Sequence, residues 1–133
     1  MIYVKDLAKS FGDNHVIKNI NMHITPGEKV VIVGPSGSGK STFLRCLNLL
    51  EQPTGGTITF DGQEITAPGV DVNKIRRRMG MVFQHFNLFA NLTVKENIML
   101  APVQLKLKTK AEAEAEAMRL LKLVNLEEKA ASY

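Results

Sequence analysis

The sequence predicts an α/β fold with an antiparallel β region and a helical segment toward its end. The run Val30–Val33 is apolar at every position, as is typical of a strand covered on both faces in a parallel sheet. The glycine-rich stretch Gly34–Thr42 joins this run to a segment with helical spacing. After residue 91 the sequence changes to helical patterns. We therefore predict a core in residues 1–91 and the start of an α-helical subdomain in residues 92–133.

The segments before the glycine-rich stretch have the patterns of β-strands. Ile2–Asp6 is predicted to form a short strand, and residues 20–24 alternate apolar and polar side chains as a half-buried strand does. A turn at Thr25–Gly27 then leads into the apolar run. Val30–Val33 is thus predicted to be a central strand of the fold.

The segments after the glycine-rich stretch predict a helix and then an antiparallel insertion. Apolar side chains recur on one helical face, and the buried set is expected to include Cys46 beside Phe43, Leu44, Leu47 and Leu50. Thr57–Phe60 has a β-rich composition, and Asp61-Gly62 is a strong hairpin dipeptide. Both features favour antiparallel pairing.

A second helix and strand precede a longer loop. Asp71–Arg78 is predicted to be a short helix, and Met79–Phe83 a second apolar strand that ends at Gln84. Residues 84–91 then form a loop. This order places Gln84 just beyond the carboxyl end of a predicted strand, the edge of an α/β sheet at which ligands bind.

Two capping boxes mark the start of the helical segment. Thr93 and Thr109 are each followed three residues later by a glutamate, Glu96 and Glu112. The stretch from Lys110 to Val124 is amphipathic, and its predicted packing stripe is Ala113, Ala117, Leu120, Leu121 and Val124.

Length and composition exclude several classes of protein. The chain has 133 residues, 44% hydrophobic content and a net charge of +4, which are ordinary values for one globular domain. Cys46 is the single cysteine, so no intramolecular disulfide or multi-cysteine zinc site is predicted. No targeting or membrane-spanning segment is predicted. The basic run Lys74–Arg78 lacks interleaved aromatic residues, so we expect a solvated helix face and no nucleic-acid partner.

The glycine-rich stretch matches the phosphate-binding pattern G-x-x-x-x-G-K-[ST] between an apolar run and a helix. Glycines let the backbone amides approach phosphate oxygens, and the start of the helix adds further donors. We expect Lys40 to reach the β and γ phosphates of ATP, and Ser41 to place its hydroxyl on Mg²⁺. The predicted nucleotide-binding residues of the loop are Gly34, Pro35, Ser36, Gly37, Ser38, Gly39, Lys40, Ser41 and Thr42.

Three further residues are weighed as parts of the site. Gln84 is positioned to reach the metal or the attacking water, although a loop glutamine is more often a surface hydrogen-bonding residue. His85 is expected to face solvent. Adenine needs an aromatic surface, for which Phe11 is the candidate and Tyr3 the competing choice.

The segments KSFG, GPSGSGKSTFLRCLNLLEQPTGG and MVFQHFNLFANLTVKENIMLAP resemble the N-terminal part of the ATP-binding subunits of ABC transporters. Within that family they look like the bacterial importers of polar amino acids, of the glutamine, histidine and arginine group. The resemblance spans Ile2–Tyr133 and implies a P-loop NTPase core of the RecA-like type. One departure is Ala90-Asn91, where relatives commonly have proline and histidine.

The resemblance assigns roles to matching residues. It implies that Phe11 stacks on adenine, that Gly34–Thr42 is the Walker A loop, and that Gln84 is the glutamine of the Q-loop, which touches Mg²⁺. Lys40 and Gln84 are thus the expected catalytic residues, and Ser41 and Gln84 the expected metal ligands. The implied partners are a second ATP-binding subunit, membrane-spanning permease subunits that face residues 84–91, and indirectly an extracytoplasmic amino-acid-binding protein. The implied location is the cytoplasmic face of the cell membrane.

Several parts of the family's active site have no counterpart in these 133 residues. No apolar run after Phe83 ends in aspartate, and Asp61 belongs to the predicted hairpin, so no Walker B strand is found. The signature loop, catalytic glutamate and switch histidine are not found either. We expect the chain by itself to bind nucleotide weakly or not at all and to show no turnover. We also expect it to be poorly soluble or only partly ordered, because an edge of the apolar strand Val30–Val33 is exposed.

Three alternatives stay open. A P-loop kinase would share the glycine-rich loop but gives no reason for the antiparallel insertion and the Gln84 loop. A non-catalytic remnant that binds nucleotide or a partner is the second alternative. The third is an ATPase subunit of another ABC branch. Which amino acid is transported cannot be inferred from this sequence.

Overall fold

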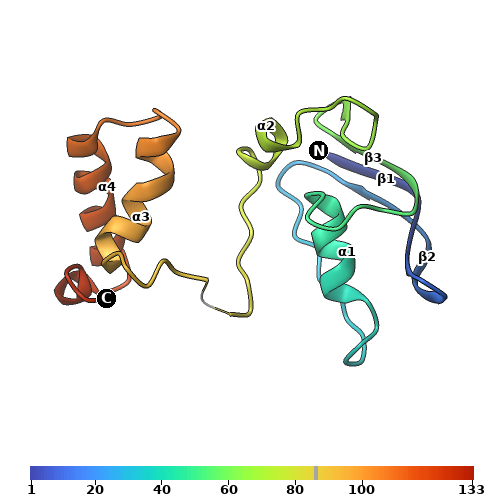
Figure 1. The fold of residues 1–133 in the computed structure, drawn as a ribbon, viewed down its shortest axis with the longest axis horizontal. Coiled ribbons are helices and arrows are strands. Elements are labelled where there is room, and N and C mark those ends of the chain that lie inside the picture. The colour runs from blue at the N-terminus through green and yellow to red at the C-terminus, as the bar shows by residue number, and fades with distance from the viewer. Residues whose placement is uncertain (86) are drawn as a thin grey trace. The chain divides into compact units, whose positions relative to one another are not determined.

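A computed structural model describes residues 1–85 and 87–133, and these residues form two compact units, Met1–Met81 and Val82–Tyr133 (Figure 1). The predicted loop 84–91 contains Phe86, which lies outside the described residues.

The first unit is built on an antiparallel sheet. Its four strands are β1 (Ile2–Phe11), β2 (Asn14–Ile24), β3 (Gly55–Phe60) and β4 (Gln63–Glu64), in the order β2-β1-β3-β4. The register pairs Phe11 with Asn14 across a tight turn, and Val4 with Ile58. The Asp61-Gly62 turn joins β3 to β4, which confirms the predicted hairpin. Strands β1 and β2 are longer than their alternating segments predicted, because they continue as one hairpin to Phe11 and Asn14.

Helix α1 (Lys40–Leu47) contributes to the core of the first unit together with the sheet. Phe43 and Cys46 are its buried residues, which confirms the prediction that Cys46 belongs to the core. Leu44 and Leu50, expected on the same buried face, are exposed. Burial raises the pKa of the Cys46 thiol and so favours its neutral form. The buried residues of this core are Val4, Leu7, Ile17, Phe43, Cys46, Leu49, Ile58, Ile65 and Ile75.

Helix α2 (Val72–Arg76) follows the antiparallel region. The Asp71 side chain accepts hydrogen bonds from the backbone amides of Asn73 and Lys74, which satisfies donors that a helix start leaves unpaired. The Arg76 guanidinium donates to the carbonyl oxygens of Asn48 and Leu49, at 3.1 and 2.6 Å. The predicted helix 71–78 is thus confirmed in a shorter form, and it is tied to the segment after α1.

Two predicted strands are absent from the sheet of the described residues, and both predictions were wrong for this structure. Val30–Val33 and Met79–Phe83 form no strand, and Val31, Val33 and Val82 are 82%, 89% and 98% exposed. The apolar pattern correctly marks residues suited to burial on both faces, but a strand also needs neighbouring backbone with which to form a hydrogen-bonded ladder. Among the described residues, neither segment pairs with the antiparallel sheet.

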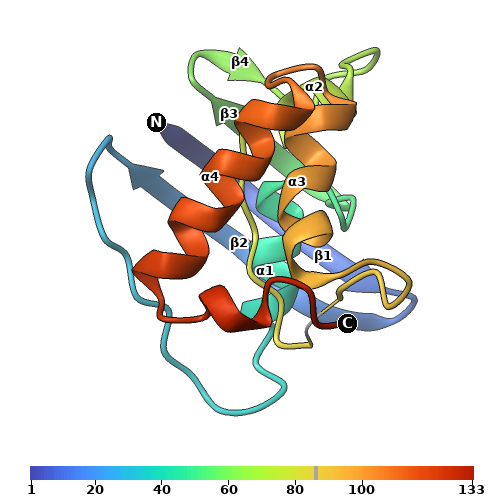
Figure 2. The same cartoon turned by 90° about the vertical axis from the view of Figure 1, so that its left-hand side faces the viewer.

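The second unit pairs two helices, α3 (Val94–Gln104) and α4 (Lys110–Leu123), which lie side by side in Figure 2. Both predicted capping boxes are confirmed, because Thr93 and Thr109 each exchange hydrogen bonds with the glutamate three residues later. In the predicted stripe, Ala113, Ala117 and Leu121 are buried, whereas Leu120 and Val124 are exposed. A 3-10 helix, η1 (Glu127–Lys129), follows α4. No helix within the described residues is long and apolar enough to span a membrane.

Candidate functional site

The glycine-rich loop has a backbone that few side chains tolerate. Gly37 and Gly39 have φ angles of 78° and 88°, in the left-handed region that glycine adopts without steric cost. Gly39 is the N-cap of α1 and forms no side-chain cap hydrogen bond, because it has no side chain to accept one. Amide donors in the first turn of α1 therefore face the loop without a capping side chain, as an anion-binding helix start requires.

Close packing also explains the glycines at the two ends of the loop. A Cβ atom on Gly39 would lie 2.9 Å from Cγ1 of Val16 on β2, which is closer than real Cβ contacts. A Cβ on Gly34 would lie 2.8 Å from Oγ of Ser38 within the loop itself. The loop is therefore packed against the β1–β2 hairpin at Gly39 and folded tightly on itself at Gly34.

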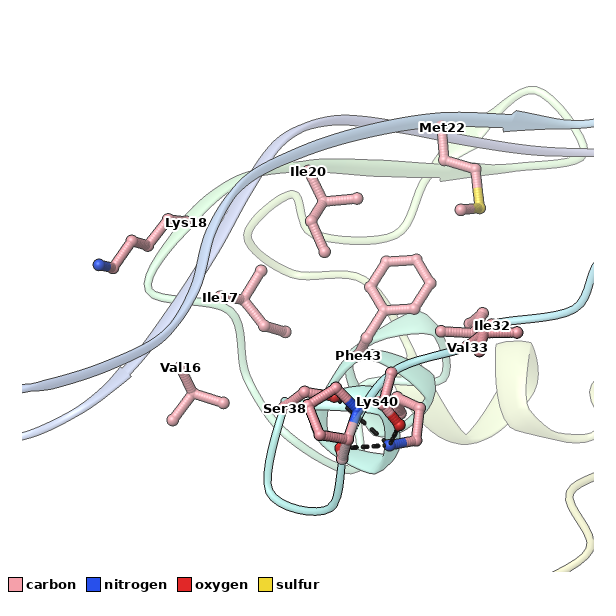
Figure 3. A pocket seen from close by; sticks show the side chains of 13 residues that line it. Val16, Ile17, Lys18, Ile20, Met22, Ile32, Val33, Ser38, Lys40 and Phe43 are labelled. Atoms are coloured by element: carbon pink, nitrogen blue, oxygen red, sulfur yellow. Dashed lines mark hydrogen bonds between the residues drawn. The ribbon is translucent and has the colours of Figure 1, made fainter.

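Lys40 extends its ammonium group back to the loop. Its Nζ donates to the carbonyl oxygens of Gly34 and Pro35, both at 2.7 Å, and approaches Oγ of Ser38 at 3.4 Å (Figure 3). Phosphate oxygens are stronger acceptors for an ammonium than neutral carbonyls, because the hydrogen bond is then charge-assisted on both sides. The ammonium and the helix-start amides together fit a polyphosphate.

The next two residues, Ser41 and Thr42, lie in the first turn of α1, Ser41 exposed and Thr42 half-buried. Mg²⁺ in nucleotide sites keeps several waters and takes only one or two protein ligands beside the phosphates. The exposed Ser41 hydroxyl fits that role. Within the described residues there is no cluster of three or more histidine, cysteine, aspartate or glutamate side chains placed to hold a metal ion.

A cavity of about 360 Å³ lies next to the loop (Figure 3). Strand β2 contributes Ile17, Ile20 and Met22 to its wall, and Ile32 and Val33 line it from the predicted strand segment. Gly34, Ser38 and Lys40 add the polar part of the lining. The cavity therefore has an apolar wall and a polar edge formed by the glycine-rich loop.

The two aromatic candidates for adenine stacking lie at opposite ends of β1. Phe11 is its last residue and is 48% exposed, and Lys9 Nζ lies 4.6 Å from the centre of its ring. Phe11 pairs with Asn14, two residues before the Val16 that packs on Gly39. Tyr3 lies at the other end of the strand, where its ring forms a T-shaped pair with the ring of His23. The hairpin thus brings Phe11, and not Tyr3, to the end of the sheet where the loop packs.

Gln84 and His85 are exposed residues of the second compact unit. The exposure of His85 is the one expected from the sequence. The role of Gln84 stays a prediction.

Sequence reasoning missed two residues of this region, Lys9 and Val16. Lys9 precedes Phe11 by two positions, so the period of a strand places both side chains on one face, and this spacing was the available signal. Val16 had no comparable signal, because its contact with Gly39 depends on how the loop folds onto β2.

Comparisons with known proteins identify the family. The sequence profile described as ABC transporter matches residues 17–133. The chain is 56% identical to the arginine transport ATP-binding protein ArtM of Bacillus subtilis and 49% identical to the glutamine transport ATP-binding protein GlnQ of Escherichia coli, in each case over 100% of this chain and 55% of the relative. The chain thus spans about half the length of the curated relatives it matches.

Solved structures agree with this match. An ATP-binding cassette solved as a dimer in a post-hydrolysis state, bound to ADP and Pi, superimposes with a TM-score of 0.85 at 38% identity, over 100% of this chain and 61% of that one. A dimeric bacterial ABC transporter cassette gives a TM-score of 0.86, also at 38% identity, over 98% of this chain and 60% of that one. These likenesses confirm the predicted P-loop NTPase fold class. The chain belongs to the ABC transporter family.

Proposed function

We propose that this chain binds Mg-ATP through the loop Gly34–Thr42, and that ATP hydrolysis by the assembled transporter energises import of a polar amino acid across the bacterial membrane. The observation that carries the proposal is the position of Lys40, whose ammonium lies against the loop carbonyls beside the first turn of α1. The phosphates of a nucleoside triphosphate supply negative charge that can pair with the Lys40 ammonium and the helix-start amides.

Each site residue has one task in this proposal. Lys40 neutralises charge on the β and γ phosphates, and the amides of Gly37 and of Gly39 to Thr42 donate to phosphate oxygens. Ser41 orients Mg²⁺, which when bound offsets charge that builds up on the phosphates during transfer. Phe11 stacks on the adenine, and Gln84 contacts the metal or the attacking water.

The proposed partners follow from the relatives and not from contacts within this chain. ArtM and GlnQ are named for transport of arginine and glutamine, and both similar cassettes were solved as dimers. We therefore propose a second ATP-binding subunit, membrane-spanning permease subunits and, indirectly, an extracytoplasmic amino-acid-binding protein as partners. The proposed location is the cytoplasmic face of the membrane, where such a subunit meets its permease.

We propose that the 133 residues by themselves bind nucleotide weakly and do not hydrolyse it. The sequence contains the Walker A loop but no Walker B aspartate and no catalytic glutamate. Phosphates can bind to a loop and a helix start, whereas turnover also requires a group that positions the attacking water.

Amide NMR measures weak binding directly. We expect Mg-ATP to shift the backbone amide signals of Gly37 and Gly39. Lys40→Ala should weaken this binding by about ten- to a hundredfold, since hydrogen bonds to charged groups are worth about 1.5–3 kcal/mol. Lys29→Ala, which removes an exposed lysine upstream of the loop, is the matched control and should leave the affinity unchanged. If millimolar Mg-ATP causes no shift in the amide signals of Gly37 and Gly39, the proposal is refuted.

A chimera tests hydrolysis and transport. Residues 1–133 replace the matching part of ArtM, and the chimera is purified with its permease partners and assayed for ATPase activity and arginine uptake. We expect ATP turnover that Lys40→Ala abolishes. Turnover that survives Lys40→Ala would contradict the assigned role of the loop, and turnover by the 133 residues alone would contradict the proposed inactivity.

A further inference from the structure

Lys9 is a buried lysine that neither the predicted active site nor the family match explains. It lies on β1 and is only 9% exposed. Its Nζ donates to the carbonyl oxygen of Gln52 at 2.8 Å and lies 3.1 Å from Oε2 of Glu51. The same Nζ lies over the ring of Phe11, 4.6 Å from its centre. Three different groups are therefore gathered around one ammonium.

The contacts of Lys9 connect two parts of the candidate site. Glu51 and Gln52 belong to the segment that follows α1, the helix that begins at the phosphate-binding loop. This segment is also tied to β1 by a hydrogen bond from the amide of Thr54 to the carbonyl of Ala8, at 2.9 Å. The segment that follows α1 thus holds the Lys9 ammonium, which also contacts the Phe11 ring at the end of β1.

The ring of Phe11 needs such a support to act as a stacking surface. Phe11 is the last residue of its strand, next to a two-residue turn, and about half of its side chain is exposed, 48%. A side chain at such a position loses rotamer freedom when a base stacks on it, which reduces the affinity gained. The quadrupole of the ring attracts a cation that lies over one face, and this attraction restricts the rotation of the ring. The rest of the ring surface is left available for stacking on a base.

We propose that Lys9 is a positioning residue for adenine recognition: its ammonium holds the Phe11 ring in the orientation in which the exposed part of the ring stacks on the base. The proposal rests on the proposed binding of ATP and goes beyond it by assigning a residue that touches no part of the nucleotide. Tyr3 offers no comparable arrangement, because its ring forms a T-shaped pair with the His23 ring.

The predicted consequence is selective for the base. Lys9 acts through Phe11, so its loss should weaken binding of Mg-ATP and leave binding of magnesium tripolyphosphate, which has no base, unchanged. A role limited to holding the fold would lower both affinities together. Loss of the cation–π contact between Lys9 and Phe11 is expected to lower the affinity for Mg-ATP about fivefold.

The experiment compares the two ligands on four forms of the chain by amide NMR titration. They are the wild type, Lys9→Met, Lys9→Arg and the matched control Lys5→Met, which removes an exposed lysine from the same strand. We expect Lys9→Met to lower the affinity for Mg-ATP about fivefold, Lys9→Arg to retain it because the guanidinium keeps the cation, and Lys5→Met to change neither affinity. Should Lys9→Met fail to fold, Lys9→Gln removes the charge and keeps a donor for Gln52.

A double-mutant cycle with Phe11→Leu tests whether Lys9 affects Mg-ATP affinity through the Phe11 ring. If Lys9 acts through the ring, then Lys9→Met has no further effect on Mg-ATP affinity once Phe11 is leucine. Equal losses for both ligands, no loss for either, or a full further loss in the Phe11→Leu background would each overturn the inference.

The outcomes for the wild type separate this inference from the proposed function. If the wild type binds tripolyphosphate and Mg-ATP with the same affinity, the proposed binding of phosphates by the loop is supported. The base then contributes nothing to the affinity, and the role of Lys9 is refuted. If it binds neither ligand, the proposed function fails, and the inference fails with it.

Discussion

Gly39 and Val16 are in contact across the boundary between the phosphate-binding loop and strand β2. A Cβ on Gly39 would lie 2.9 Å from Cγ1 and 3.2 Å from the carbonyl oxygen of Val16. The φ angle of Gly39 is also positive, 88°. The glycine before the loop lysine therefore serves two needs, a left-handed backbone and close packing on the hairpin.

Gly39→Ala should destabilise the first unit by about 1–3 kcal/mol, because the new methyl group meets Val16 and the backbone angle becomes strained. Urea denaturation followed by circular dichroism measures the change. Gly12→Ala is the matched control, since Gly12 also has a positive φ, 56°, but a methyl group added there would meet nothing within 4 Å. Gly12→Ala should lower the free energy of unfolding only by the cost of the strained backbone angle. Adding Val16→Ala to Gly39→Ala should recover part of the loss, and no recovery would mean that sterics are not the cause.

Ala117 should not tolerate a larger side chain, because it is fully buried in the small core formed with Met99 of α3. We expect Ala117→Leu to lower the free energy of unfolding by about 1–3 kcal/mol through overpacking. Ala115→Leu, on the exposed side of the same helix, should be nearly neutral. Thermal melts of the helical signal compare the two variants. Equal melting temperatures would contradict the described packing of α3 on α4.

The capping boxes predict a loss of helix stability in acid. Hydrogen bonds from the backbone amide and then the hydroxyl of Thr93 and Thr109 lower the pKa values of Glu96 and Glu112. A carboxylate with a lowered pKa stabilises the fold above the ordinary glutamate pKa of about 4.3, and this contribution is lost as pH falls through the lowered pKa.

The double variant Glu96→Gln/Glu112→Gln tests this pH dependence, because glutamine keeps a capping acceptor but does not titrate in this range. We expect the helical circular dichroism signal of the double variant to change less between about pH 5 and pH 3 than that of the wild type. Identical pH profiles would show that other carboxylates dominate acid unfolding.

The exposed valines of the segment Val30–Val33 should promote self-association. Val31 and Val33 are 82% and 89% exposed, and an apolar extended segment without a paired edge is a template for association between chains. Val31→Thr/Val33→Thr should raise the concentration at which sedimentation velocity detects oligomers. Val4→Thr is the contrasting variant, since it places a hydroxyl in the core and should cost about 1–3 kcal/mol of stability. A sharp, cooperative melt of a monomeric wild type would count against the exposed-edge argument.

The local signals in the sequence were sufficient for several elements. The Asp61-Gly62 hairpin and the two capping boxes were predicted correctly, because each depends on residues only a few positions apart. The helix after the glycine-rich loop begins at Lys40, in agreement with the phosphate-binding pattern. Within the candidate site, the glycine-rich pattern correctly predicted a helix start after the loop, whereas Phe11, expected in a loop, is the last residue of β1. The roles of the loop residues and of Phe11 stay predictions.

What the sequence by itself determined is therefore the glycine-rich pattern of the loop and the starts of the helices, since local backbone preference governs both. The helix ends were less accurate, because α1 ends at Leu47 and α2 at Arg76. Tertiary structure alone decided that Val30–Val33 forms no strand among the described residues, that Phe11 rather than Tyr3 lies at the loop end of the hairpin, and that Lys9 is buried against the Phe11 ring. A strand needs a neighbouring backbone, and a cation–π contact needs two side chains fixed by distant packing. Both depend on residues far apart in the chain, which no local pattern records.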